Sequence, residues 1–138
     1  RSYAREPTGG TLVRIAVVEP DELLADLVSF RLQLLGHQIT NWHGGRELLS
    51  RIDETTVDLL LIDIYQPDMP GWEAILKVRA THTAEQLPIL ALSVDTDLSL
   101  VEQAYKAGAN DYLITPFDPA TLQRKTDALL LKKHLVAK

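Results

Sequence analysis

Residues 58–71, with the sequence DLLLIDIYQPDMPG, contain an apolar run that ends in a carboxylate and continues into a turn-rich segment. The run at 59–62 is too short and too uniformly apolar for an amphipathic helix, so it predicts a strand buried on both faces of a parallel sheet. Two prolines and a glycine at 67–71 predict a loop. We therefore expect Asp63 at the carboxyl end of a central strand, where open α/β sheets bind ligands. From this run alone, Asp63 suits a loop cap as well as a functional site.

The composition is typical of a globular protein that has no disulfide bonds. A length of 138 residues predicts one domain with a substantial core. The net charge of -5 argues against a nucleic-acid or membrane surface, and the lack of cysteine excludes disulfides and thiolate zinc sites. No apolar run reaches the roughly 18 residues of a membrane span and no secretory signal opens the chain. We expect a cytoplasmic protein with a tail or linker at 1–10 and one domain at 11–138.

Strand and helix patterns alternate five times along the chain. Helix starts are indicated by Pro20 and Pro119, and helix ends by Gly36 and Gly108. The pattern predicts a five-stranded, doubly wound parallel sheet with helices on both faces. The first helix is expected to bury Leu23, Leu24, Leu27, Val28, Phe30, Leu34 and Leu35. Strands are expected at 12–18, 38–42, 59–62, 87–92 and 111–114, and the later helices at 46–52, 72–80, 98–107 and from 119 towards 136, with caps at 95–97 and Asp118.

Polar side chains directly follow four of these strands. They are Glu19, Asp63, Ser93 and Thr115, and the carboxyl ends of parallel strands cluster at one edge. Two close carboxylates need a cation or an upward pKa shift in one of them. Mg²⁺ fits, because it binds through one or two carboxylates together with waters and a phosphate. The set predicts phosphoryl chemistry on a nucleophilic carboxylate, although the acids at 19–22 also suit the start of a helix.

Four motifs stand at the strand ends: VVE at 17–19, LID at 61–63 with its following loop, PILALS at 88–93, and AGANDYL at 107–113 followed by Pro116-Phe117. Together they resemble the receiver domain of two-component response regulators, over nearly the whole chain from residue 12. The resemblance implies a flavodoxin-like fold with strand order 2-1-3-4-5. It also implies a signalling domain of a phosphorelay, with at most slow self-phosphorylation and self-dephosphorylation as enzymatic activity.

The resemblance assigns roles to individual residues. Asp63 matches the aspartate that accepts a phosphoryl group from a histidine kinase or phosphotransfer protein. Glu19 matches the first acid of the metal-binding pair, and the backbone carbonyl of Tyr65 matches a further Mg²⁺ ligand. Ser93 matches the hydroxyl that hydrogen-bonds the phosphoryl group, and Tyr112 matches the aromatic switch.

The resemblance also implies a partner-binding face, built from the fourth helix, the fifth strand and the fifth helix. This face would include Leu98, Val101, Tyr105 and Tyr112, and would bind an output domain or a second copy of the chain. The apolar run at 129–131 is open to extra core contact or to a dimer seam. The resemblance further predicts a cis peptide before Pro116, while Lys132, Lys133 and His134 suit a helix C-terminus.

Two positions depart from the receiver pattern. Pro20 occupies the place of the second acid, and Thr115 occupies the place of a lysine that pairs with the acceptor aspartate or its phosphate. Losing one charge-assisted hydrogen bond typically costs about 1.5–3 kcal/mol. Because the second acid of the metal-binding pair is missing, Mg²⁺ binding is expected to be weak or absent.

Three hypotheses follow from these departures. The chain is a phosphoacceptor receiver, a pseudo-receiver that binds partners without phosphorylation, or a flavin or nucleotide binder. The last lacks a glycine-rich loop after the first strand, where 19–21 reads EPD. Of the remaining candidates, His37 and His43 are read as surface or loop residues, and Trp42 and Trp72 as packing residues.

Overall fold

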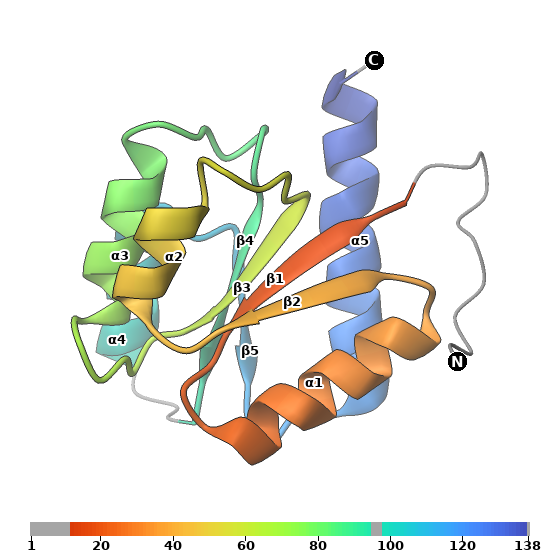
Figure 1. The fold of residues 1–138 in the computed structure, drawn as a ribbon, viewed down its shortest axis with the longest axis horizontal. Coiled ribbons are helices and arrows are strands. Elements are labelled where there is room, and N and C mark those ends of the chain that lie inside the picture. The colour runs from red at the N-terminus through yellow and green to blue at the C-terminus, as the bar shows by residue number, and fades with distance from the viewer. Residues whose placement is uncertain (1–11, 95–97, 138) are drawn as a thin grey trace.

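The computed structural model describes residues 12–94 and 98–137, and these form a three-layer α/β fold (Figure 1). All strand pairs are parallel and the order is β2-β1-β3-β4-β5, which confirms the predicted sheet. The strands are β1 (Arg14–Val18), β2 (Gln38–Trp42), β3 (Leu59–Asp63), β4 (Ile89–Ser93) and β5 (Asp111–Ile114). The helices are α1 (Glu22–Leu34), α2 (Gly45–Arg51), α3 (Gly71–Arg79), α4 (Leu98–Ala107) and α5 (Pro119–Ala137).

The central strand β3 is buried at all five of its residues, as predicted. Leu60 and Ile62 pack with α2, α3 and α4 on one face of the sheet. Leu59 and Leu61 pack with α1 and α5 on the other face. Figure 1 shows the two helix layers on opposite sides of the strands. Because side chains alternate along a strand, a continuous apolar run is what a sheet covered on both faces requires.

Helix α1 buries only part of the set that the sequence predicted: Val28 is buried, and Leu24 and Leu35 pack against the core. Its buried residues are Ala25, Val28, Ser29 and Leu32. The predicted core residues Leu23, Leu27, Phe30 and Leu34 are 42–70% exposed. Both sets have helical spacing, so periodicity alone cannot choose between them. The buried set contains the small residues Ala25 and Ser29, which let the helix lie close to the sheet.

Several boundaries move by one or two residues. The fourth strand starts at Ile89, because Pro88 has no backbone N–H, and only its carbonyl pairs, accepting from Leu60 N at 3.0 Å. Helix α3 begins at Gly71, where a Cβ would lie 2.4 Å from Ile64 Cα. The positive φ values of Gly36 and Gly108 confirm the predicted ends of α1 and α4. Asp118 caps α5 as predicted, while the cap expected at 95–97 lies outside the described residues.

The remaining predictions concern the peptide bond before Pro116, the two tryptophans and two histidines. The Thr115–Pro116 peptide is cis, and Trp42 is 2% exposed in the core, with Trp72 packed against the same cluster. His37 lies in the loop before β2, as predicted, but it is half-buried, and its two ring nitrogens are buried without a hydrogen-bond partner in the described part of the chain. Burial lowers the pKa of His37. His43 is exposed, as predicted.

The amino ends of the strands are closed by a hydrogen-bond network around Arg79. Its guanidinium donates to Gly108 O at 2.9 Å, to Leu87 O at 2.8 Å and to Asn110 Oδ1 at 2.8 Å. The same Asn110 oxygen accepts from Ile89 N at 2.8 Å. The network ties α3, the start of β4 and the loop before β5 together.

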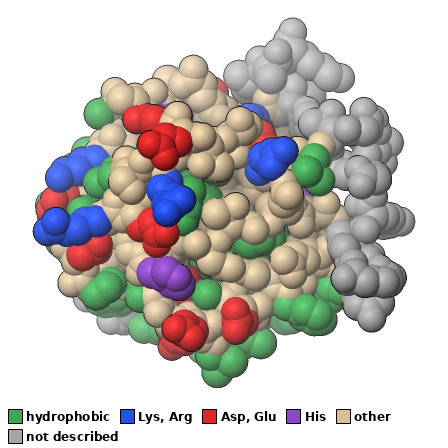
Figure 2. Space-filling view, viewed as in Figure 1, with side chains coloured by type: hydrophobic (Ala, Val, Ile, Leu, Met, Phe, Trp, Pro, Cys, Tyr) green, Lys and Arg blue, Asp and Glu red, His purple; other side chains and the backbone are tan. Residues whose placement is uncertain are grey.

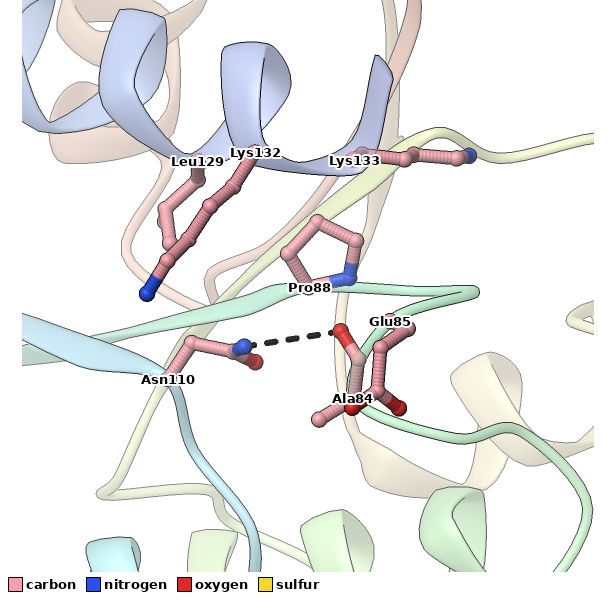
Figure 3. Close-up of a pocket in the computed structure, with 7 residues that line it drawn as sticks. All are labelled: Ala84, Glu85, Pro88, Asn110, Leu129, Lys132 and Lys133. Carbon is pink, nitrogen blue, oxygen red and sulfur yellow. Dashed lines mark hydrogen bonds between the residues drawn. The ribbon is translucent and has the colours of Figure 1, made fainter. Parts of the chain in front are cut away.

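A small pocket lies beside this network, between α5 and the loop before β4 (Figure 3). Its volume is about 170 Å³. Asn110 donates to Ala84 O across it at 3.4 Å. Lys133, near the C-terminal end of α5, lines the pocket and pairs with Asp58 at 3.1 Å, so α5 is tied to this end of the sheet.

Candidate functional site

The carboxyl ends of the strands bring the four predicted polar side chains to one edge of the sheet. Glu19, Asp63, Ser93 and Thr115 follow or end β1, β3, β4 and β5, and each is at most 6% exposed. Backbone hydrogen bonds continue the sheet at this edge: Thr115 N donates to Ser93 O at 2.8 Å, and Ile64 N to Leu92 O at 2.9 Å. The site is therefore built on rigid strands.

Glu19 and Asp63 form a hydrogen-bonded carboxyl pair. Burial, together with the bond to Asp63, raises the pKa of Glu19 to about 8. Burial also raises the pKa of Asp63, against the opposing effects of its bonds to Glu19 and to Tyr65 N. Burial therefore favours a proton on the carboxyl pair at neutral pH.

The remaining contacts of the pair fix its orientation. Asp21 N donates to Glu19 Oε2 at 3.0 Å, and Tyr65 N donates to Asp63 Oδ1 at 2.8 Å. The Asp21 carboxylate accepts from Leu24 N at 3.1 Å and caps α1. Asp21 thus stays at the helix start, as expected, and does not replace the acid that Pro20 lacks.

Three buried polar atoms near this edge have no hydrogen-bond partner within the described residues. They are Glu19 Oε1, Gln66 Oε1 and Thr115 Oγ1. Buried polar atoms are nearly always paired, so such a group calls for an ion, a water or a ligand. Two of the three are acceptor oxygens, which are the ligands that Mg²⁺ prefers.

The site has fewer acidic side chains than a metal site built from protein ligands alone. Within residues 12–94 and 98–137, no group of three or more His, Cys, Asp or Glu side chains is placed to hold a metal ion. Glu19 and Asp63 remain, together with the predicted Tyr65 carbonyl. Two carboxylates suffice for Mg²⁺, which keeps several waters in its coordination shell.

The loop after β3 is held by contacts on both sides. Asp68 accepts from Gly45 N at 3.1 Å and Arg46 N at 2.9 Å, and so caps α2 from a distant part of the chain. These hydrogen bonds, led by the one from Arg46, lower the pKa of Asp68. Tyr65 forms an isolated antiparallel bridge with Pro70. The backbone around Tyr65 is therefore fixed relative to Asp63.

Gln66 is a site residue that sequence reasoning missed. Its side-chain nitrogen donates to Asp63 O at 2.6 Å and to Val18 O at 3.2 Å. The only signal in the sequence was a lone amide between the acceptor strand and Pro67, which is too common in loops to be informative.

Tyr112, the predicted switch, lies half-buried beside α4 and α5. Its ring meets Tyr105 edge-on with centroids 6.0 Å apart, and Lys125 Nζ lies 5.0 Å from its centroid. Asp111 Oδ1 accepts from Tyr105 Oη at 3.2 Å and from Lys125 Nζ at 3.0 Å. Burial raises the pKa of Tyr105 to about 12, with Asp111 contributing. These contacts hold the Tyr112 ring between the two helices.

The rest of the predicted partner face is mixed. Leu98 is 76% exposed and Tyr105 is 41% exposed, but Val101 is buried and cannot contact a partner in this conformation. Of the apolar run on α5, Leu129 and Leu130 are core residues, and Leu131 is 61% exposed. The apolar excess is therefore mostly core contact.

Comparison with known proteins decides the family. The family model described as the response regulator receiver domain matches residues 15–127. The chain belongs to this family. It is 32% identical over 119 residues to the phosphate regulon transcriptional regulatory protein PhoB of Rhizobium meliloti, covering 86% of the chain and 52% of PhoB. It is 30% identical over 122 residues to a chemotaxis protein CheY homolog of Campylobacter jejuni, covering 86% of the chain and 92% of the homolog.

Solved receiver structures share the fold. A putative response regulator from Chloroflexus aurantiacus superposes with a TM-score of 0.82 at 29% identity, covering 88% of this chain and 99% of that one. A CheY-like receiver domain protein from Methanospirillum hungatei gives 0.83 at 25% identity, covering 90% and 98%. The chain spans about half the length of the PhoB that it matches.

Membership of the receiver family sets the general role. Receiver domains are signalling modules of two-component systems that generally bind Mg²⁺ at an acidic pocket and interact with histidine kinases or phosphotransfer proteins. They are generally non-enzymatic. Across the described part of the chain, no helix combines the length and apolarity that a bilayer span requires.

Proposed function

We propose that this receiver domain accepts a phosphoryl group on Asp63 from a histidine kinase or phosphotransfer protein in the cytoplasm. The observation that carries the proposal is the buried Glu19–Asp63 pair, beside which three buried polar atoms lack partners within the described residues. Such unmatched groups are expected where a cation and a phosphoryl group bind.

The hydrogen bonds of Asp63 define how it reacts. Tyr65 N occupies Oδ1, which leaves Oδ2 to form the bond to phosphorus while the bond from phosphorus to the donor nitrogen breaks. The ring of the donor histidine keeps the electron pair and takes up a proton. Ser93 and Thr115 supply hydroxyl donors to the phosphoryl oxygens, and Mg²⁺, when bound, neutralises charge on them.

The carboxyl pair links metal binding to proton release. Glu19 and Asp63 would hold Mg²⁺ together with the Tyr65 carbonyl, and carboxylate ligands must be ionised. Since burial raises the pKa of Glu19 to about 8, Glu19 would have to lose its proton before it could hold a cation near neutral pH. Mg²⁺ affinity should therefore rise between pH 6 and pH 9.

Thr115 makes the reaction slow. A hydroxyl can donate one hydrogen bond to the phosphoryl group, but it brings no positive charge. Transfer depends mainly on positioning and charge neutralisation, so a missing cation reduces the rate. The same observation, together with the protonated pair, favours a second candidate function, in which the domain binds partners without being phosphorylated.

The signal would leave through α4, β5 and α5, where Tyr112 and its neighbours lie. The exposed Leu98, Tyr105 and Leu131 offer apolar contacts to an output domain or a second copy of the chain. A phosphoryl group on Asp63 would reach this face through Ser93 and Thr115, which precede α4 and α5.

Phosphorylation by a small donor tests the proposal. The protein is incubated with acetyl phosphate and Mg²⁺, and intact mass is measured over time for the wild type and for Asp63→Asn. Asp53→Asn is a matched control, since Asp53 is 69% exposed and far from the strand ends in sequence. An adduct in the wild type and the control that is lost in Asp63→Asn supports the proposal. No adduct at any Mg²⁺ concentration overturns it in favour of the second candidate function.

A further inference from the structure

The backbone ladder between β1 and β3 stops where the site begins. Val18 pairs with Ile62 in the parallel register, and Glu19 N donates across to Trp42 O on β2 at 3.1 Å. In a strand, successive backbone groups point to opposite sides. Residues 18 and 20 therefore face β3, and the next hydrogen bond of the ladder would run from the N–H of residue 20 to the carbonyl of Asp63.

Residue 20 cannot make that hydrogen bond. It is Pro20, which has no backbone N–H. The Asp63 carbonyl would be left without its ladder donor at a buried edge. Instead it accepts from Gln66 Nε2 at 2.6 Å, and the same nitrogen donates its second hydrogen to Val18 O at 3.2 Å. The side chain spans the two strands where the backbone cannot.

We propose that Gln66 replaces the hydrogen bond that Pro20 removes and acts as a positioning residue for the acceptor site. The replacement of the hydrogen bond is independent of the proposed function, and only the role of Gln66 in positioning the acceptor site rests on it. Glu19 directly follows Val18, and Asp63 is the last residue of β3, so the amide joins the two backbone carbonyls nearest the carboxyl pair. It fixes the separation of the strands at the point where the carboxyl groups must meet.

The two contacts of Gln66 show which end of its side-chain amide is the nitrogen and which is the oxygen. Because both contacts of Gln66 are with carbonyl oxygens, the nitrogen must be the end that bridges the strands. Its Oε1 is left buried and without a partner among the described residues. Gln66 thus also contributes an acceptor oxygen near Asp63, where the receiver pattern has lost an acid at residue 20.

A double-mutant cycle tests the replacement. Gln66→Met removes the donor at similar length, and Pro20→Ala restores a backbone N–H. Urea unfolding gives the equilibrium constant for all four proteins. We expect Gln66→Met to raise the unfolding constant roughly fivefold to tenfold in the Pro20 protein, as for a buried carbonyl that loses its donor. In the Pro20→Ala background the increase should be less than about twofold.

Mg²⁺ binding provides the readout that a merely structural role would not move. Titration calorimetry measures the Mg²⁺ dissociation constant of the four proteins. We expect this constant to be at least about threefold larger in Gln66→Met than in the wild type, and to return to the wild-type value in the double mutant. Gln123→Met on the exposed side of α5 is the control and should change neither quantity.

The two proposals fail in different ways. An equal effect of Gln66→Met in both backgrounds means that the two residues are independent, and it overturns the replacement. Coupling in stability with an unchanged Mg²⁺ constant overturns the positioning role. If the wild type binds no Mg²⁺ and takes up no phosphoryl group, the proposed function fails, and the unfolding cycle alone decides whether Gln66 substitutes for the missing N–H.

Discussion

The two ends of the sheet are built on opposite principles. At the amino end, the half-buried Arg79 donates to four backbone carbonyls and to the Asn110 side chain within 3.2 Å, and both ends of the Asn110 amide are hydrogen-bonded. At the carboxyl end, Glu19, Gln66 and Thr115 each bury an atom that has no partner in the described part of the chain. The buried polar groups around Arg79 are satisfied internally, whereas those at the carboxyl end are not; His37, directly before β2, is the exception at the amino end.

This difference separates stability from function. Burial lowers the pKa of Arg79, yet its hydrogen bonds keep the charge at the amino end in place. Burial raises the pKa of both carboxyl groups at the other end. The amino end holds the fold together, whereas the carboxyl end is completed by what binds there.

Removing the guanidinium should have the largest effect. Arg79→Met leaves several buried carbonyls and the Asn110 oxygen without their donor, so we expect a loss of about 2–4 kcal/mol in unfolding free energy. Urea denaturation measures it, with Lys77→Met as the control, because the exposed Lys77–Glu73 pair at 3.4 Å should contribute under about 0.5 kcal/mol. A loss as small as that of the control would contradict the role of the amino end.

Neutralising Glu19 should remove most of the pH dependence of stability. Its folded pKa of about 8 lies above the ordinary pKa of 4.5 for a glutamate, so the folded state binds the proton more tightly, and stability falls as pH rises from 4.5 to 8. At about 1.4 kcal/mol per pKa unit, even half of this shift costs more than 2 kcal/mol at pH 8. Glu19→Gln should flatten the urea midpoint over this range, and an unchanged slope would contradict the shared proton.

Restoring the missing cation should speed phosphorylation. Thr115→Lys returns a charge-assisted hydrogen bond of about 1.5–3 kcal/mol to the phosphoryl group, so the initial rate with acetyl phosphate should rise by roughly 10-fold to 150-fold. Thr121→Lys, on the half-buried first turn of α5, is the control for added charge. A rate equal to that of the control would show that the amine does not reach the site. An ammonium near the pair should also lower the pKa of Glu19.

The smallest effect is expected between the two ends, on the face around Tyr112. Tyr105→Phe removes one partly exposed hydrogen bond to Asp111, so we expect a loss of about 0.5–1 kcal/mol. The tyrosine that titrates near pH 12 by absorbance should disappear in this variant. If the high-pH tyrosine signal persists in Tyr105→Phe, the assignment of the Asp111 contact is wrong.

The sequence predicted the strands better than the side chains between them. An uninterrupted apolar run such as 59–62 leaves no choice of face, so β3 and the edge that carries Asp63 were predictable. Helix α1 offered two apolar faces, and the structure buries the one with small residues. Val101 was misplaced for a similar reason, since its burial depends on which distant element packs against it.

The site was predictable only where residues stand at strand ends. Glu19, Asp63, Ser93 and Thr115 are brought to one edge by the parallel topology alone. Gln66 reaches the site by its side-chain length and loop geometry, and no periodicity reports these. His37 shows the same limit, because its burial is a product of tertiary packing that neighbouring residues in the sequence do not encode.

The emission of the two tryptophans can report on the two carboxyl groups of the site, Glu19 and Asp63. Trp42 O accepts from Glu19 N at 3.1 Å, while Trp72 follows Gly71, whose backbone packs against Ile64 next to Asp63. Figure 2 shows acidic, basic and hydrophobic side chains interspersed on the face viewed as in Figure 1, and the sequence contains two tryptophans. The single-indole proteins Trp42→Phe and Trp72→Phe should therefore resolve events at the two carboxyl groups as separate changes in emission.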